Sequence, residues 1–330
     1  MTILVLGDAN ADLSAALQRF PAEGDDSQIT TLGWSSGGGG ANVAAALALL
    51  GAPARLLARI GSDPAAEIAL RVARAAGTDL AAVQIDDSLA TGLCFAAVSP
   101  GGERTFFSYR GANVSFEFGP GQLEGARWLH ISGYALLEGR QRAATLALID
   151  VAEARDIPIS LDLCLPQLRA WRDEAIALLP RLHILFANEP ELAILTAKNA
   201  KIENATNLLG DLDALAIEPL LQQGVSTVAV KLGPRGCLIA TTGTRHYAPG
   251  FAIDTVDTNG CGDAFVAGYL FAHLRGTTVE HCAALANAIG ALKATRLGAA
   301  EALPDRATLR AFLTETQNHS SLVNLLSYHK

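Results

Sequence analysis

The segment with the strongest chemical character is a glycine-rich turn between two acids, Asp257 to Asp263, which reads Asp-Thr-Asn-Gly-Cys-Gly-Asp. An apolar stretch over residues 264–274 follows it directly and predicts a buried helix that begins at the turn. Unpaired amides and the dipole at a helix N-terminus bind anions. The amides expected there are those of Gly260, Cys261 and Gly262. A carboxylate at Asp263, beside such an anion site, is what phosphoryl transfer to an alcohol requires.

A purely structural interpretation of this turn is also open. Aspartate is a preferred N-cap, and a glycine pair before a helix can serve only to make a tight turn. That interpretation does not explain why Asp257 also leads the segment, because two acids flanking a turn repel each other unless cations or substrate protons offset the repulsion.

Two further groups of residues suit the binding of a polyol. A run of four glycines, including Gly38 and Gly39, precedes Asn42 at the start of an Ala/Leu-rich helix. Glycines let a ligand approach the backbone, and the Asn42 amide can donate and accept hydrogen bonds. Asn10 and Asp12 follow the first buried strand, where an amide and a carboxylate suit sugar hydroxyls. A flexible loop and an Asx-turn are the respective alternatives.

Two later turns carry weaker signals. Asn188-Glu189-Pro190-Glu191 follows a buried strand and opens a helix, so capping explains it well. Alternatively, Asn188 and Glu191 hold a hydrated Mg²⁺, which needs only one or two protein carboxylates. The segment from Lys231 through Gly233 to Gly236 is either an ordinary turn between two strands or a turn lying beside a nucleotide.

The elements that position these residues alternate between strand and helix. We expect buried strands at 3–6, 56–60, 128–131, 157–161, 184–187 and 227–231, with shorter strands around Leu238 and His246. We expect helices at 41–50, 64–76, 142–153, 189–196, 214–223, 263–274, 280–295 and 305–315. Repeated βα units predict a mostly parallel sheet covered by helices on both faces, with ligands at the carboxyl ends of its strands.

An antiparallel hairpin at 93–109 and the polar region near 12–36 interrupt this alternation and predict a small lid. The expected organisation is one domain over residues 1–316, with lid segments at approximately 12–36 and 91–112. A tail at 317–330 has no assigned role.

Composition narrows the class of protein. Of the 330 residues 50% are hydrophobic and 18% are charged, a composition that excludes a disordered chain. The net charge of −8 argues against nucleic-acid or anionic-membrane partners. The five cysteines are scattered, which fits a reducing compartment, and no apolar run approaches the roughly 18 residues of a membrane span. We expect a cytoplasmic protein.

The sequence resembles the ribokinase-like (PfkB) carbohydrate and nucleoside kinases over residues 3 to about 313. The Asp257–Asp263 signature and the glycine run ending in Asn42 carry the resemblance, supported by the Asn-x-x-Glu match at Asn188 and the turn after Lys231. It implies a three-layer αβα fold with a mostly parallel central sheet and a small β-lid. It also implies transfer of the γ-phosphoryl group of ATP to a substrate hydroxyl.

The resemblance assigns roles to individual residues. Asp263 is the expected base, and the amides of the turn form the anion hole. Facing the substrate are Asn10, Asp12, Gly38, Gly39, Asn42, Phe107 and Asn113. On the nucleotide side are Asn188, Lys231, Gly233, Gly236 and Asn287. Mg²⁺ is expected at Asn188 and Glu191 through water, and K⁺ at Asp257, Asn259 and the loop 295–299. A homodimer through the lid is also implied.

Two departures from the family pattern bear on the acceptor. Gly39 stands where ribokinases usually carry a lysine, and the segment after Asp162 lacks the Asn and Arg of many sugar kinases. We therefore expect a neutral polyol acceptor in preference to a phosphorylated one.

The resulting hypothesis is a kinase acting on a hydroxymethyl group of a ribose-, fructose- or keto-deoxy-sugar-acid-type substrate. A nucleoside kinase of the same family is the alternative, and a kinase-like binder without turnover is a third. A dinucleotide-dependent oxidoreductase is disfavoured because the glycine run lacks G-x-G-x-x-G spacing, and the absence of Gly-Lys-Ser/Thr excludes a P-loop kinase.

Overall fold

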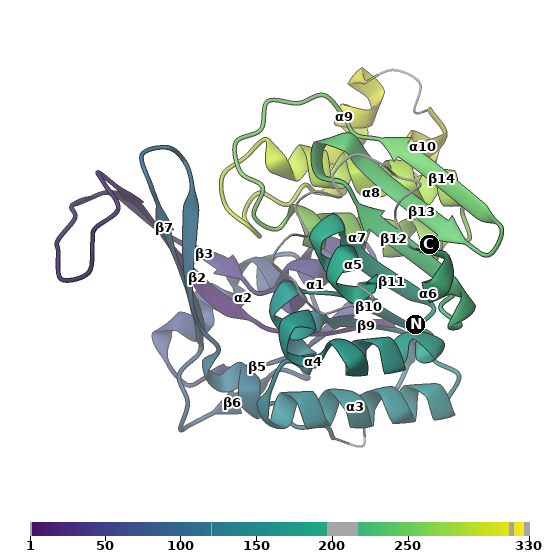
Figure 1. The fold of residues 1–330 in the computed structure, drawn as a ribbon, viewed down its shortest axis with the longest axis horizontal. Helices are drawn as coiled ribbons and strands as arrows, with labels where there is room; N and C mark the ends of the chain where they lie inside the picture. The colour runs from purple at the N-terminus through teal and green to yellow at the C-terminus, as the bar shows by residue number, and fades with distance from the viewer. Residues whose placement is uncertain (1, 120, 197–216, 317–319, 327–330) are drawn as a thin grey trace.

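An eight-stranded sheet runs through the middle of the molecule and separates two layers of helices (Figure 1). The computed structural model describes residues 2–119, 121–196, 217–316 and 320–326. In spatial order the strands are β14 (Thr244–Pro249), β13 (Gly236–Thr241), β12 (Thr227–Lys231), β11 (Ile184–Asn188), β10 (Ile159–Asp162), β9 (Ala126–Ser132), β1 (Thr2–Leu6) and β4 (Ala54–Leu57). The strands from β12 to β4 are parallel, and β13 and β14 add an antiparallel edge.

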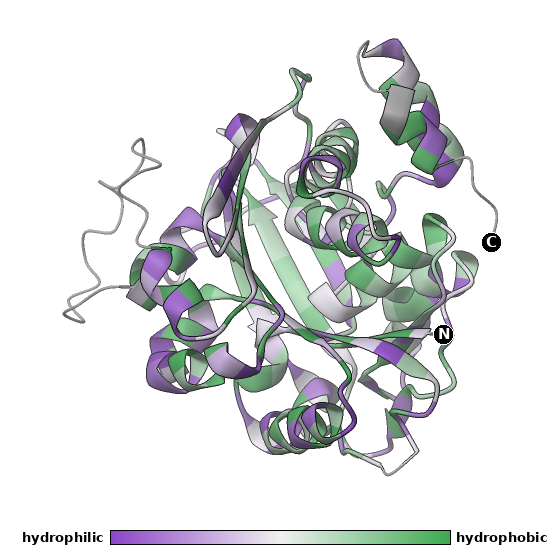
Figure 2. Ribbon diagram, turned by 90° about the vertical axis from the view of Figure 1, so that its right-hand side faces the viewer, coloured by the Kyte–Doolittle hydropathy of each residue, from purple (hydrophilic) through white to green (hydrophobic). Residues whose placement is uncertain are grey.

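Both faces of the parallel part of this sheet are buried, which explains the continuous apolar runs of its strands. In β1, Ile3 and Val5 face one core cluster while Leu4 and Leu6 face the other. Figure 2 shows the hydrophobic central strands in green. The first cluster is covered by α1 (Gly39–Leu49), α2 (Pro64–Ala75), α7 (Cys261–His273), α8 (Val279–Ala294), α9 (Arg306–Glu315) and α10 (Ser320–Leu325). The second is covered by α3 (Gly139–Ala154), α4 (Leu165–Leu178), α5 (Glu189–Thr196) and α6 (Glu218–Gln222).

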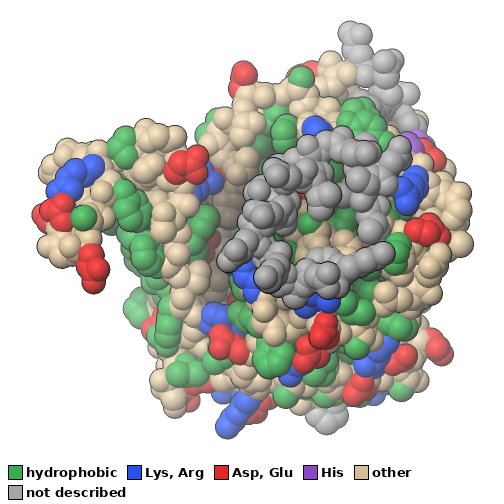
Figure 3. Space-filling model, viewed as in Figure 1, with side chains coloured by type: hydrophobic (Ala, Val, Ile, Leu, Met, Phe, Trp, Pro, Cys, Tyr) green, Lys and Arg blue, Asp and Glu red, His purple; other side chains and the backbone are tan. Residues whose placement is uncertain are grey.

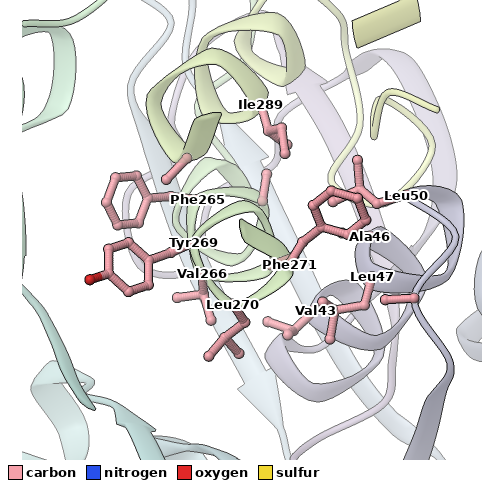
Figure 4. Close-up of a cluster of buried hydrophobic side chains, with 14 of the residues drawn as sticks. Val43, Ala46, Leu47, Leu50, Phe265, Val266, Tyr269, Leu270, Phe271 and Ile289 are labelled. Carbon is pink, nitrogen blue, oxygen red and sulfur yellow. The ribbon is translucent and has the colours of Figure 1, made fainter. Parts of the chain in front are cut away.

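Helices α1, α7 and α8 pack closely in the first layer (Figure 4). Val43 and Leu47 of α1 lie toward Leu270 and Phe271 of α7, and Ile289 comes from α8. Because α1 and α7 begin at the two glycine-rich segments, this apolar contact fixes the relative position of those segments.

A separate four-stranded sheet projects from the body as the lid (Figures 1 and 3). Its order is β3 (Ile29–Gly37), β2 (Asn10–Leu17), β7 (Gly92–Val98) and β8 (Arg104–Tyr109). Strands β7 and β8 form the expected antiparallel hairpin, and β2 pairs with β7 in parallel.

The predicted three-layer α/β class is confirmed, with several local differences. The strand expected at 56–60 is two strands, because β4 joins the main sheet and β5 (Arg59–Gly61) pairs with β6 (Gln84–Asp86). Helix α4 and the lid strands β2 and β3 were not predicted. Of the helix expected at 214–223, the described part is α6, and residues 214–216 lie outside the described residues.

Leu322 and Leu326, at the end of the chain, are buried in the first core cluster. Arg306 Nε also donates a hydrogen bond to the Leu326 carbonyl. The described part of the tail therefore packs on the domain core. None of the described helices is long and apolar enough to cross a membrane.

Candidate active site

The start of α7 forms the centre of the site. Gly260 is the N-cap with φ 79°, a left-handed conformation that favours glycine, and Asp263 lies in the first helical turn. The amide of Cys261 donates to the Thr258 carbonyl at 3.2 Å, which corrects the expectation that all three amides are free. Within the described part of the chain, the amides of Gly260 and Gly262 have no such partner. They remain available to an anion at the positive end of the helix dipole.

Asp263 meets the start of α1. Asn42 Nδ2 donates to Asp263 Oδ2 at 2.7 Å, while Oδ1 lies 3.6 Å from where a Cβ on Gly39 would stand. Burial raises the pKa of Asp263 to about 6, against the lowering effect of the Asn42 hydrogen bond. A carboxylate with a pKa near neutrality is a stronger base than an ordinary aspartate and is still largely ionised at pH 7.

A cavity of about 190 Å³ lies between the lid and two loops, one before α7 and one after α8. Its wall includes Asp12, Asp257, Glu301 and Arg104. Among the described residues, the buried Oδ1 atoms of Asp12 and Asn42 have no hydrogen-bond partner. Burial, with Glu301 and Asp263 nearby, raises the pKa of Asp12 to about 7. Two unpaired acceptors near a base are suited to the hydroxyl donors of a polyol.

On the other side of the α7 N-terminus lies an ammonium group. Lys231 Nζ is 2.5 Å from Asp162 Oδ1 and 3.5 Å from where a Cβ on Gly262 would stand. Burial alone would lower the pKa of Lys231, but Asp162 and Glu191 raise it above its usual value. This cation is therefore held beside the amide hole. The sequence had indicated neither this role of Lys231 nor the position of Asp162, although Asp162 ends a buried strand like the other expected site residues.

Asn188 and Glu191 form a reciprocal cap at the start of α5. The Asn188 amide donates to Glu191 Oε2 at 2.8 Å, and the Glu191 amide donates to Asn188 Oδ1 at 2.9 Å. Burial raises the pKa of Glu191 to about 7, although Lys231 opposes the shift. No group of three metal-ligating side chains occurs in the described part of the chain. The donor set fits Mg²⁺ held mainly by water and substrate phosphates, since such sites need few carboxylates.

A second cavity of about 500 Å³ lies beside the residues expected to bind the nucleotide. It is lined by Asn188, Glu189, Pro190, Lys231, Leu232, Gly233, Pro234 and Arg235. Gly236 follows as the first residue of β13. Asn287 is buried and donates to the carbonyls of Ala248 and Pro249, so its amide anchors the end of β14 and is absent from the cavity wall.

The structure corrects two expected substrate contacts. Side chains alternate between the two faces of a strand. Phe106 therefore lines the cavity of about 190 Å³, whereas Phe107 points to the other face of the lid and contacts Phe95. Asn113 is fully buried at the lid hinge, where its Oδ1 accepts from the Ala9 amide and its Nδ2 donates to Asn10 Oδ1 at 2.9 Å. Asn113 therefore positions Asn10 and does not face the cavity.

The oxygen atoms of Asp257, the first of the expected K⁺ ligands, do not fit a cation. The Asp257 carbonyl accepts from Lys293 Nζ at 2.8 Å, and Arg104 Nη1 lies 2.7 Å from Asp257 Oδ1. The amides of Asn259 and Gly298 donate to the same carboxylate. Donors and positive charges already surround the oxygen atoms that a monovalent cation would need.

The chain matches the family described as pfkB family carbohydrate kinase over residues 2–306. It is 32% identical over 314 residues to the ATP-dependent ribose-1-phosphate kinase of Halopiger xanaduensis, covering 95% of this chain and 98% of that protein. It is 27% identical to fructokinase-2 of Zea mays, over 84% of this chain and 85% of the other. The structure of Arabidopsis thaliana ribokinase complexed with ribose and ATP has a TM-score of 0.76 at 25% identity, covering 99% of both chains.

Proposed function

Because this chain belongs to the pfkB family of carbohydrate kinases, we propose that it transfers the γ-phosphoryl group of MgATP to a hydroxymethyl group of a small sugar, with Asp263 as base. The observation that carries the proposal is the partly buried Asp263 carboxylate at the α7 N-terminus, which accepts a hydrogen bond from Asn42 Nδ2 at 2.7 Å.

In this mechanism Asp12 and Asn42 accept hydrogen bonds from sugar hydroxyls and orient the hydroxymethyl group toward Asp263. Asp263 takes the hydroxyl proton as the new O–P bond forms and the bond between the γ-phosphorus and the β-γ bridging oxygen breaks, so ADP leaves with that electron pair. The amides of Gly260 and Gly262 and the ammonium of Lys231 stabilise the charge on the transferring group.

The nucleotide occupies the larger cavity beside the turn at Gly233. Asn188 and Glu191 would hold Mg²⁺ through water, and the bound ion would neutralise phosphate charge. No monovalent cation is included, because the oxygen atoms of Asp257 are already occupied.

The size of the acceptor cavity favours a monosaccharide. Its volume of about 190 Å³ lies below the roughly 300–1,000 Å³ of sites for drug-sized ligands, which disfavours a nucleoside. Asp257 is paired with Arg104, and the other two carboxylates in the wall, Asp12 and Glu301, disfavour an anionic acceptor. A phosphorylated or acidic sugar is the second candidate, because Arg104 lies in the same wall and one relative is named a ribose-1-phosphate kinase.

The proposal is tested by initial rates of phosphotransfer from ATP, measured with each candidate acceptor in turn. These acceptors are ribose, fructose, a keto-deoxy sugar acid, ribose 1-phosphate and nucleosides. We expect turnover with a neutral sugar, and loss of turnover but retention of ligand binding in Asp263→Asn. A higher rate with ribose 1-phosphate or the sugar acid would favour the second candidate. A higher rate with nucleosides would show that the acceptor is a nucleoside and not a free sugar. Binding of ATP and sugar with no phosphotransfer would refute kinase activity altogether.

We also propose that the chain forms a homodimer through its lid. Four large hydrophobic side chains on the lid's edge strands stand outside the wall of the cavity and are each 44–55% exposed. They are Ile29 and Leu32 on β3 and Phe107 and Tyr109 on β8. Pairing two lids would cover this surface. Sedimentation velocity of the full chain, compared with a Leu32→Ser/Phe107→Ser double variant, is the test; a monomeric parent protein would contradict the proposal.

A further inference from the structure

Lys293, in the last turn of α8, has a completely buried side chain with 0% exposure. Lysine is almost never fully buried unless it is paired, because removing its charge from water is costly. Such a residue needs a partner whose interaction offsets the free energy of desolvation, and here that partner is Asp257 of the signature segment.

The ammonium group of Lys293 contacts Asp257. Its Nζ donates to the Asp257 carbonyl at 2.8 Å and lies 3.9 Å from Asp257 Oδ1. The amide of Asp257 in turn donates to the Ala294 carbonyl at 3.0 Å. The beginning of the glycine turn is therefore fastened to the end of α8 by one ammonium group and one backbone bond.

The carboxylate of Asp257 completes the arrangement. It accepts from Arg104 of lid strand β8 at 2.7 Å, from the Asn259 amide at 2.8 Å and from the Gly298 amide at 2.9 Å. Two positive side chains thus meet one carboxylate three residues before the amide hole at Gly260. Because the turn is short, the orientation of the Asp257 peptide bears directly on where the amides of the hole point.

We propose that Lys293 is a positioning residue whose ammonium group does the work of a bound monovalent cation, so that the enzyme needs no such ion. The inference rests on the kinase activity proposed above. An ammonium on a side chain is a compact unit charge, and its covalent attachment makes its occupancy independent of the ion content of the medium. It holds the Asp257 carbonyl and thereby the signature turn.

The first test uses the parent enzyme. Initial phosphotransfer rates and thermal midpoints are measured at constant ionic strength in the chlorides of sodium, potassium, ammonium and choline. We expect equal rates and equal midpoints, since a cation that bound the native state would raise the midpoint. Specific activation or stabilisation by potassium would overturn the inference while leaving the kinase activity intact. Absence of phosphotransfer in every salt would instead reject the proposed function.

The second test removes the charge. Lys293→Met keeps the length of the side chain, and Arg155→Met, at an exposed position at the end of α3, is the matched control for the loss of one positive charge. We expect turnover of Lys293→Met to fall about tenfold or more, less than the roughly 100–1,000-fold typical of removing an oxyanion donor itself, with KM for ATP little changed.

Ammonium or potassium ions should restore part of the lost turnover in Lys293→Met and should have no effect on Arg155→Met. A loss of turnover that no cation restores would overturn the inference, because it would indicate a packing role only. Circular dichroism and the thermal midpoint establish that the variant is folded. If it does not fold, the salt series on the parent enzyme decides by itself.

Discussion

The ionised Asp263 carboxylate should destabilise the folded protein, because the burial that raises its pKa also disfavours its charge. Its pKa rises from 3.8 to about 6 on folding, chiefly through burial. At 1.36 kcal/mol per pKa unit, the ionised group destabilises the native state by about 3 kcal/mol relative to a neutral one.

The sign follows from proton linkage. A carboxyl group with a raised pKa in the folded chain binds its proton more tightly there, so its penalty is absent below about pH 4 and complete above about pH 6. Asp263→Asn removes the charge and can still accept the hydrogen bond from Asn42. We therefore expect the variant to be inactive and more stable than the parent at pH 8, by about 1–3 kcal/mol, with the gain shrinking toward pH 4.

Urea unfolding followed by circular dichroism at pH 8 and pH 4.5 measures this difference. Asp79→Asn is the control, because hydrogen bonding from the Ala81 amide and the pairing with Arg55 lower the pKa of Asp79, although burial opposes this. Its substitution should cost more stability at pH 8 than at pH 4.5. A constant gain for Asp263→Asn at both pH values, or a loss at pH 8, would refute the argument that burial of the charge raises this pKa.

Four further predictions concern activity. The kcat/KM of the parent should fall below about pH 6 as Asp263 protonates, visible in a pH–rate profile. Lys231→Met should lower turnover by roughly 100–1,000-fold in steady-state assays, because the ammonium lies beside the amide hole. Asp12→Asn should raise KM for the sugar while leaving KM for ATP unchanged, since its unpaired oxygen belongs to the acceptor side. Phe106→Ala should raise KM for the sugar, whereas Phe107→Ala should leave that KM unchanged, because only Phe106 lines the cavity.

Local patterns were sufficient to predict the layers of the fold, and the two glycine-rich segments of the proposed site do lie together. The strand β1, the helix α1 and the helix α7 follow from apolar runs and glycine boundaries, and their ends carry Asn42 and Asp263. The lid strands β2 and β3 were missed because neither shows a regular alternation of apolar and polar residues: β3 is an edge strand exposed from Ile29 to Trp34, and the two buried residues of β2, Ala11 and Ala15, are four positions apart. The break between β4 and β5 depends on which sheet each half joins, and no local pattern records that choice.

Contacts between distant residues were not predictable in the same way. Lys293 and Arg104 converge on Asp257 from an apolar helix and from a lid strand, 36 and 153 residues away. The residue Asn113 was assigned to the substrate because its type suits a sugar, yet the same amide equally suits a buried hinge. The type of a residue limits the interactions that its side chain can make, whereas long-range packing decides which of these partners lies within hydrogen-bonding distance.

The way in which charges pair in this site favours the proposed role of Asp263 as the base. Both lysines in the described part of the chain lie near the α7 N-terminus, and each has its own acid: Lys231 has Asp162, and Lys293 has Asp257. A lysine paired directly with Asp263 would hold the pKa of that carboxyl low and weaken it as a base. With both ammonium groups engaged elsewhere, the neutral Asn42 is the hydrogen-bond partner of Asp263 among the residues that the structure describes, and burial raises the pKa of Asp263. In the proposed reaction, the acidic residues around the turn pair with these cations, so that positive charge lies close enough to stabilise a phosphoryl group without neutralising Asp263.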